Sequence, residues 1–126
     1  MFVKCIETAQ GAADFLNKMF VGVLHEKIVI VHLDHSGAVL KVSTENGYKQ
    51  HVNLPIRAIL FEAMQIKADA IIIAHNHPSG NAWPSKEDCA ATRLLAETAR
   101  ALEVELRDHL IFAGGDCRSF REMGLL

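Results

Sequence analysis

Hydrophobic and polar positions recur with two different periods along the first third of the chain. In residues 8–24, apolar side chains return at helical spacing, which predicts an amphipathic helix. The segment Lys27–Leu33 reads KIVIVHL and is rich in β-branched residues, as is typical of a strand. Asp34–Gly37 contains residues that favour a turn, and Ala38–Thr44 is again strand-like. The pattern therefore predicts a helix followed by a β-hairpin.

The middle of the chain continues with a turn, a helix and a buried strand. Asn46–Gly47 is a turn signal, and a short strand is expected over Tyr48–Val52. A helix is expected over residues 55–67, because proline favours the first helical position and apolar residues then follow at helical spacing. Asp69–Ala74 is a short continuous apolar run, as expected for a strand that is covered on both faces.

The last third repeats this alternation of helix and strand. His75–Pro84 is rich in residues that favour loops, and Ser85–Leu102 has the length and the spacing of a long helix. Strands are expected over Val104–Ala113 and Cys117–Phe120, with a turn at Gly114–Asp116 between them. Since helices alternate with strands, the fold class is α/β. We expect a single domain over residues 1–126, in which helices sandwich a mixed β-sheet.

The composition is that of an ordinary globular chain. Of the 126 residues, 50% are hydrophobic and 22% are charged, and this length fits one domain. The formal net charge is −2, so the chain lacks the basic excess that supports phosphate contacts. The sequence does not exclude a nucleic-acid partner, but the net charge does not support one. The apolar runs are too short to span a membrane, and the N-terminus lacks the pattern of a signal peptide.

The cysteines indicate a reducing environment. Cys5, Cys89 and Cys117 are odd in number, far apart and without a Cys-x-x-Cys pair. This argues against a disulfide framework and against a four-cysteine zinc site. A cytoplasmic location is the simplest interpretation.

The residues that carry chemistry gather where the buried strand ends. His75 and His77 follow that strand, and residues two apart in extended chain project to the same side. Pro78 keeps His77 extended, and Asp88 lies in the first turn of the next helix. Two imidazole nitrogens and one carboxylate oxygen leave a fourth tetrahedral position open, as in catalytic zinc sites. Strand ends of α/β sheets are also where ligands usually bind.

Simpler interpretations exist for each part of this pattern. A His-x-His pair taken alone is usually two unrelated histidines. Ser85-x-x-Asp88 matches a capping box, in which Ser85 caps the helix and Asp88 hydrogen-bonds back to the main chain. Such a cap competes with metal binding for the Asp88 carboxylate. The functional interpretation rests on the convergence of two histidines, a shaped loop and a carboxylate at a helix start.

The same residues resemble a known motif. Glu26, His75-Asn76-His77, Ser85 and Asp88 match the pattern of the JAMM (MPN+) metalloproteases: Glu, then His-x-His, seven residues, Ser, two residues and Asp. HNHPSG and the later stretch Asp108–Ile111 resemble the RadC-like branch, known as a DNA repair protein family. The resemblance extends from about Leu24 to the end of the chain.

This resemblance implies a JAMM/MPN fold, which is cytidine-deaminase-like, and a zinc-dependent peptidase or isopeptidase that acts on a peptide or protein substrate. His75, His77 and Asp88 would bind Zn²⁺. Glu26 would be the general base that moves a proton from the zinc-activated water to the leaving amine. Ser85 would hydrogen-bond the oxyanion. RadC-like proteins typically carry a helix-hairpin-helix-like region before this domain, and we expect it to be absent here because few residues precede Glu26.

Glu26 depends most on the resemblance. At the start of the first strand, a solvent-facing glutamate would be the ordinary expectation. Glu7, Glu45 and Glu62 are rival candidates for the general base on sequence grounds.

Other polar residues near the motif have simple structural interpretations. His109, next to Asp108, either orients another residue behind the site or is a strand residue satisfied by its neighbours, and the second is the simpler interpretation. Cys89 is expected to serve helix packing and not to bind the metal. Trp83 either shapes a substrate groove or packs onto the loop. Asn76 and Ser79 are expected to shape the loop through hydrogen bonds.

Two alternative functions can be compared with the sequence. The first is a non-catalytic accessory module in DNA repair or recombination that uses the metal for stability. The second is a zinc nucleobase deaminase, whose signature is His-x-Glu with Pro-Cys-x-x-Cys. Position 77 is histidine and the chain has no such cysteine pair, so the sequence argues against a deaminase.

Overall fold

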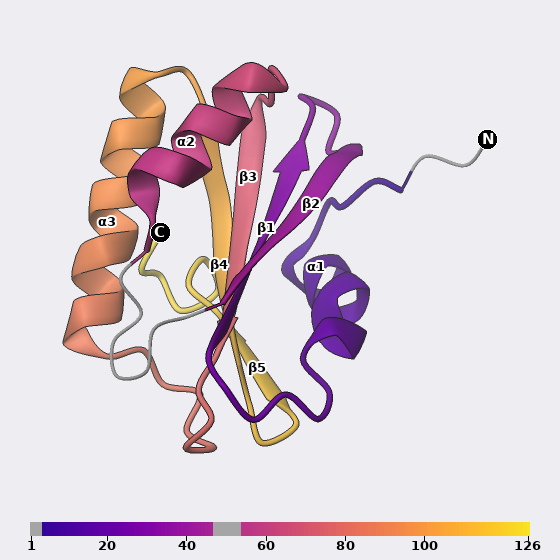
Figure 1. Ribbon diagram of the computed structural model, residues 1–126, viewed down its shortest axis with the longest axis vertical. Helices are drawn as coiled ribbons and strands as arrows, with labels where there is room; N and C mark the ends of the chain where they lie inside the picture. The colour runs from indigo at the N-terminus through magenta and orange to yellow at the C-terminus, as the bar shows by residue number, and fades with distance from the viewer. Residues whose placement is uncertain (1–3, 47–53) are drawn as a thin grey trace.

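A five-stranded mixed sheet lies between helices on both faces, as predicted. The computed structural model describes residues 4–46 and 54–126, and the turn at Gly47 and the strand expected over Tyr48–Val52 lie outside them. Within the described part, the strand order is β2-β1-β3-β4-β5. Helix α1 covers one face, and α2 and α3 cover the other (Figure 1).

The first helix is shorter than the sequence predicts. Helix α1 spans Ala9–Leu16 and continues as the 3-10 turn η1 (Asn17–Met19). Thr8 caps its start, since its hydroxyl accepts a hydrogen bond of 2.9 Å from the Gly11 N–H. The expectation that the helix reaches residue 24 is wrong. Gly22 has a φ of 73°, in the left-handed region that a helix does not use.

Strands β1 (Lys27–Leu33) and β2 (Val39–Asn46) form the predicted antiparallel hairpin. Asp34 holds the turn, because its Oδ1 accepts hydrogen bonds from the N–H groups of Ser36 and Ala38. This hairpin places β1 directly beside the central strand.

The central strand β3 (Ala70–Asn76) is buried along its whole length. It runs two residues further than predicted, so His75 and Asn76 belong to the strand and not to the loop. The reason is that neighbouring strands hold these two residues: β1 pairs Ile28 with His75, and the strand on the other side pairs Phe112 with Asn76. Helix α2 (Ile56–Gln65) precedes β3, and helix α3 (Lys86–Ala101) follows it.

Strand β4 (Glu105–Ala113) runs parallel to β3, and β5 (Asp116–Ser119) returns antiparallel to it. The β3–β4 register shifts by one residue, since Ile71 pairs with Leu106 but Ile72 pairs with Asp108. Arg107 is the extra residue, and its carbonyl accepts a hydrogen bond of 2.6 Å from Arg121 Nε instead. Because side chains alternate along a strand, this bulge exchanges the two faces of β4 beyond Arg107.

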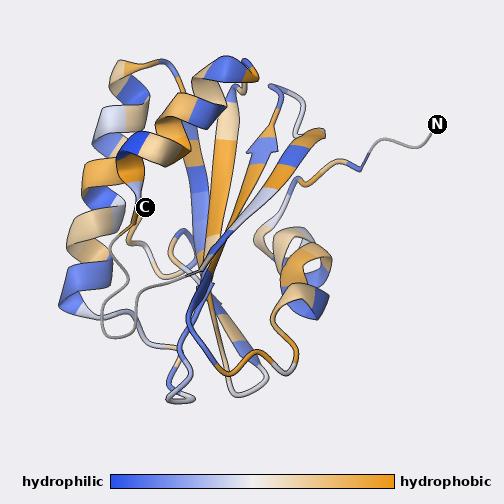
Figure 2. Cartoon of the chain, in the orientation of Figure 1, coloured by the Kyte–Doolittle hydropathy of each residue, from blue (hydrophilic) through white to orange (hydrophobic). Residues whose placement is uncertain are grey.

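Each face of the sheet carries its own apolar core. The cluster under α2 and α3 includes Ile71, Ile73 and Leu95. The cluster under α1 includes Leu16 and Ile72. The strands are mostly hydrophobic, while the helices are striped with polar residues (Figure 2). No helix within residues 4–46 and 54–126 combines the length and the hydropathy needed to cross a membrane.

Candidate metal centre

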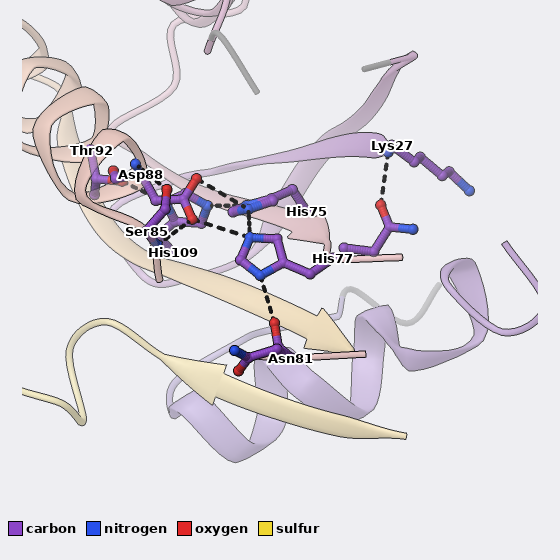
Figure 3. A network of polar contacts seen from close by, with 9 residues as sticks. Lys27, His75, His77, Asn81, Ser85, Asp88, Thr92 and His109 are labelled. Carbon is purple, nitrogen blue, oxygen red and sulfur yellow. Dashed lines mark hydrogen bonds and ion pairs between the residues drawn. The ribbon is translucent and has the colours of Figure 1, made fainter. Parts of the chain in front are cut away.

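Three side chains from β3, the following loop and α3 converge on one point (Figure 3). His75 Nε2 lies 3.0 Å from His77 Nε2, and His77 Nε2 lies 3.1 Å from Asp88 Oδ2. His75 Nε2 lies 3.6 Å from Asp88 Oδ1. His75, His77 and Asp88 form a group that could hold a metal ion, here called the metal-ligand group.

The local structure explains why these side chains meet. His75 is the last residue of β3 that is paired on both sides, and the His77 N–H continues the ladder by donating to the Phe112 carbonyl at 2.9 Å. His75 and His77 therefore stay two residues apart in extended chain and project to the same side. The β3–α3 loop then brings the first turn of α3, with Asp88 in its third position, over the end of the strand.

The capping box and the cluster use the same carboxylate without conflict. Ser85 Oγ accepts from the Asp88 N–H at 2.9 Å, and Asp88 Oδ2 accepts from the Ser85 N–H at 2.8 Å. These two bonds fix the Asp88 rotamer at the helix start. In that rotamer Oδ2 also contacts His77 while Oδ1 faces His75. The cap thus holds the carboxylate in place for the cluster.

The ring of His77 presents a lone pair to the cluster. Its Nδ1 lies 2.7 Å from the Asn81 carbonyl oxygen, which can only accept. The proton must then reside on Nδ1, and the neutral ring has its lone pair on Nε2. This lone pair, the Nε2 atom of His75 and an anionic carboxylate face one another at 3.0–3.6 Å.

The donor set fits a tetrahedral divalent cation. Nitrogen and oxygen ligands lie about 2.0–2.2 Å from zinc, so two corners of the tetrahedron are separated by roughly 3.3 Å. The three separations in the cluster lie around this value. Atoms that only accept hydrogen bonds repel one another at such distances unless a cation or a proton lies among them.

Burial and charge set the protonation of the group. Burial lowers the pKa of His75 to about 4, against the pull of the Asp88 charge, so this ring is neutral at neutral pH. When His77 takes up a second proton, on Nε2, it donates to Asp88, and this hydrogen bond raises the pKa of His77 despite partial burial. Burial alone would raise the pKa of Asp88, but the hydrogen bonds from protonated His77 and from the Ser85 N–H outweigh it and hold that pKa well below its usual range.

Glu26 lies beside this group, at the start of β1. Its charge contributes to the raised pKa of His77, and its Oε2 atom is buried without a hydrogen-bond partner among the described residues. Asn76 holds this segment from both sides. The Asn76 Oδ1 accepts from the Lys27 N–H at 2.8 Å, and Nδ2 donates to the His25 carbonyl at 2.9 Å. The chain is thereby fixed immediately before and after Glu26.

The rival glutamates lie in other surroundings. Glu7 and Glu45 are exposed, and Glu62 is bound by His32, Ser43 and Lys41. Ser85 is exposed at the edge of the metal-ligand group. Because its oxygen accepts from the Asp88 N–H, its own hydroxyl proton is available to a ligand in the site.

Three residues outside the predicted ligand and catalytic set support the site. His109 had two interpretations, and the structure supports the one in which it orients another residue, since its Nε2 lies 2.6 Å from His75 Nδ1. Thr92 Oγ1 lies 2.7 Å from His109 Nδ1, and the sequence offered no signal for this residue. Asn76 was expected to shape a loop and instead bridges β3 to the chain around Glu26.

Two other residues behave close to expectation. Cys89 packs against the small cluster of Ile111 and Phe120, as predicted. Trp83 is exposed, and the guanidinium of Arg118 lies 3.9 Å from its ring centroid. Trp83 therefore contacts Arg118 of β5.

A groove of about 350 Å³ opens next to His77. One wall is the apolar segment that includes Phe20 and Leu24, and the opposite wall is the β4–β5 turn with Gly114 and Asp116. A ligand bound in this groove would therefore reach the metal-ligand group from the side of His77.

The arrangement agrees with a comparison against known families. The family model of the RadC-like JAB domain matches residues 6–125, nearly the whole chain. The match covers every residue of the metal-ligand group, together with Glu26 and Ser85.

Proposed function

Because the chain belongs to the RadC-like JAB domain family, we propose that it is a zinc-dependent hydrolase of the JAMM type that cleaves peptide or isopeptide bonds. The observation that carries this proposal is the convergence of His75, His77 and Asp88 on one point. Two imidazole nitrogens with one carboxylate oxygen are the ligands of a zinc site that keeps one position open for chemistry.

The bound ion would supply Lewis acidity, which lowers the pKa of a coordinated water to about 7. The remaining tasks belong to the protein. His75 and His77 would present neutral nitrogens, and the Asp88 carboxylate would offset part of the charge of the ion. The three side chains already lie close together, so little rearrangement would be needed when an ion binds.

Glu26 would move the proton. Its Oε2 atom is buried near His77 and has no hydrogen-bond partner in residues 4–46 and 54–126, so it is placed to accept a proton from the attacking water. It would then return that proton to the leaving amine. Ser85 would donate its hydroxyl proton to the oxygen of the scissile carbonyl as negative charge develops, which contributes on the order of 3 kcal/mol in comparable sites.

Zinc content tests the first part of this proposal. We expect purified protein to contain about one zinc ion per chain, and the His75→Ala/His77→Ala double variant to lose it. The control is His35→Ala, since the His35 side chain is exposed and lies outside the group. Protein that holds no stoichiometric metal after careful preparation would contradict the proposal.

Glu26→Gln tests the second part. Incubation with a library of proteome-derived peptides and with ε-branched isopeptides should yield new termini, detected by mass spectrometry. We expect Glu26→Gln to retain zinc and to lose cleavage, while Glu7→Gln, an exposed glutamate, retains both. If wild type and Glu26→Gln hold zinc equally and neither cleaves, the non-catalytic accessory module becomes the better account.

A further inference from the structure

We propose that His109, supported by Thr92, is a positioning residue that holds His75 in the tautomer able to bind a metal. This inference rests on the proposed function, because it assigns a role toward the ion that His75 would ligate. It concerns side chains on the far side of His75 from the open site.

A continuous hydrogen-bonded chain runs from one ligand to the other through the interior (Figure 3). His75 Nδ1 lies 2.6 Å from His109 Nε2, and His109 Nδ1 lies 2.7 Å from Thr92 Oγ1. Thr92 Oγ1 in turn lies 2.6 Å from the main-chain carbonyl oxygen of Asp88. His75, His109 and Thr92 are each at most 1% exposed, so water does not compete for these contacts.

The last contact fixes the direction of all the others. A carbonyl oxygen only accepts, so the Thr92 hydroxyl must give its one proton to Asp88. Thr92 can then only accept from His109, whose proton must lie on Nδ1. A neutral His109 has its lone pair on Nε2 and accepts from the His75 Nδ1–H. His75 is left with its lone pair on Nε2, the atom that faces His77 and Asp88.

The bulge at Arg107 places His109 beside His75. In the shifted register His109 pairs with Ile73, so its side chain lies on the face covered by α3, as that of His75 does. If Arg107 instead paired with Ile72 in a regular ladder, His109 would pair with Ala74 and point into the core under α1. Phe120 stacks on the His109 ring with centroids 4.6 Å apart and planes 9° from parallel, which restrains its rotation.

The two histidines of the metal-ligand group thus have different hydrogen-bond partners, and each partner fixes the tautomer of its ring. His77 is held by the Asn81 carbonyl in the loop, and His75 is held by a side chain in the core. Hydrogen-bond partners behind metal ligands fix the tautomer, and their loss typically lowers metal affinity by roughly 10- to 100-fold. Since Thr92 also bonds to the main chain of Asp88, the same chain ties the positions of two ligands together.

Two matched pairs of variants test this role through zinc affinity, measured by competition with a chelator. His109→Phe keeps the ring that stacks on Phe120 but leaves the His75 Nδ1–H without an acceptor, so we expect zinc to bind roughly 10- to 100-fold more weakly. His109→Gln offers an acceptor and a donor and should recover most of this loss. Thr92→Val should weaken zinc binding, and Thr92→Ser, which keeps the hydroxyl, should not.

Nitrogen chemical shifts of the histidine rings in the zinc-free protein give a second readout that requires neither metal nor activity. We expect wild-type His75 to be protonated at Nδ1, and His109→Phe to give a mixture of tautomers. Wild-type zinc affinity in His109→Phe, or a proton on Nε2 of His75 in the wild type, would overturn the inference. Failure of the proposed function would instead appear as absent zinc or absent cleavage with the His75 tautomer as expected.

Discussion

Asn76 shows how a single carboxamide can organise a site that it does not enter. It is 4% exposed and occupies the last position of β3, between the two histidines. Both ends of its amide are used, one by the His25 carbonyl and one by the Lys27 N–H. Glu26 lies between these two residues, so the amide determines where the glutamate enters the site.

We predict that Asn76→Ala lowers cleavage more than it lowers zinc affinity, because it releases Glu26 while leaving the three ligand side chains in place. Two main-chain groups lose their partner, so the free energy of unfolding should fall by about 1–3 kcal/mol. Cleavage rate, zinc affinity and urea denaturation measure the three quantities. Ser79→Ala, a change in the exposed loop, is the control, and equal cleavage by Asn76→Ala and wild type would contradict the role.

Among individual residues, the sequence predicts the three members of the metal-ligand group but not the residues that hold them in place. His75, His77 and Asp88 lie within 14 positions of one another, so strand alternation and a helix start suffice to bring them together. His109 lies 34 positions from its partner His75. Its contact depends on the parallel pairing of β3 with β4 and on a register shift, neither of which has a signal in the local pattern.

At the start of helix α3, Ser85 has two roles. Ser85 caps the helix through its oxygen and, in the proposed mechanism, assists cleavage through its proton. The sequence left these as competing interpretations, and the structure shows the cap and the convergence of ligands side by side.

Substitutions at Ser85 separate the two tasks. We predict that Ser85→Ala lowers the unfolding free energy by about 1 kcal/mol and Ser85→Gly by only a few tenths, because glycine is well tolerated at a helix N-cap. Both should lower cleavage to a similar, much larger extent, while Ser85→Thr keeps stability and part of the activity. If cleavage follows stability across the three variants, the hydroxyl acts only as a cap.

A second polar junction joins the β1–β2 hairpin to α2, away from the metal centre. Glu62 accepts from the fully buried His32 at 2.8 Å, from Lys41 at 3.0 Å, and from Ser43. The Ser43 hydrogen bond, with those from Lys41 and His32, lowers the pKa of Glu62 to about 2. This carboxylate therefore links α2 to two strands.

We predict that Glu62→Gln lowers the unfolding free energy at pH 7 by about 1–3 kcal/mol, since hydrogen bonds to a charged group are lost. The folded-state pKa lies below the ordinary value of 4.5, so the contribution of Glu62 is present above pH 4.5 and disappears as the pH falls toward 2. Urea denaturation at pH 7 and pH 3 should show a smaller difference at pH 3. Lys41→Met, at a half-exposed position, should cost less than about 1 kcal/mol.

Element boundaries were predicted best where hydrogen bonding is local. Strand β1 matches the predicted Lys27–Leu33, and α3 begins and ends within one residue of the prediction. The first helix was predicted too long, because the apolar spacing continues past Met19 while Gly22 turns the chain. Strand β3 was predicted too short, because polar residues at its end are held by neighbouring strands that a local pattern does not reveal.

The molecule as a whole keeps several histidines neutral in its interior. Burial lowers the pKa of His32, of His75 and of His109 below the ordinary value of 6.5. All three are less than 2% exposed and lie on the side of the sheet covered by α2 and α3. Protonation of these rings is therefore less favourable in the folded protein than in the unfolded chain.

We predict that the zinc-free protein loses stability as the pH falls below 6.5, because the unfolded chain binds protons that the fold excludes. Each such histidine contributes a slope of up to about 1.4 kcal/mol per pH unit. His77 has a raised pKa, so its contribution has the opposite sign and is lost above pH 6.5. Denaturation between pH 7.5 and 5 measures the slope; His32→Gln should reduce it and His35→Ala should not, and a flat profile would contradict this account.

The architecture was the most predictable level. Alternating helices and strands, with one fully apolar strand, indicated a mixed sheet covered on both faces, and the structure confirms it. The strand order β2-β1-β3-β4-β5 was not predicted, since it depends on which hairpin edge the central strand joins. The core clusters on the two faces settle that choice by burying β3 completely.

The one-residue bulge at Arg107 lets β4 lose a residue without moving the site. Deletion of Arg107 would restore regular pairing, with Leu106 still opposite Ile71 and Asp108 still opposite Ile72. His109 would then still lie opposite Ile73, on the same face as His75. A shortened β4 should therefore keep the metal centre intact and lose only the hydrogen bond from Arg121 Nε to the Arg107 carbonyl.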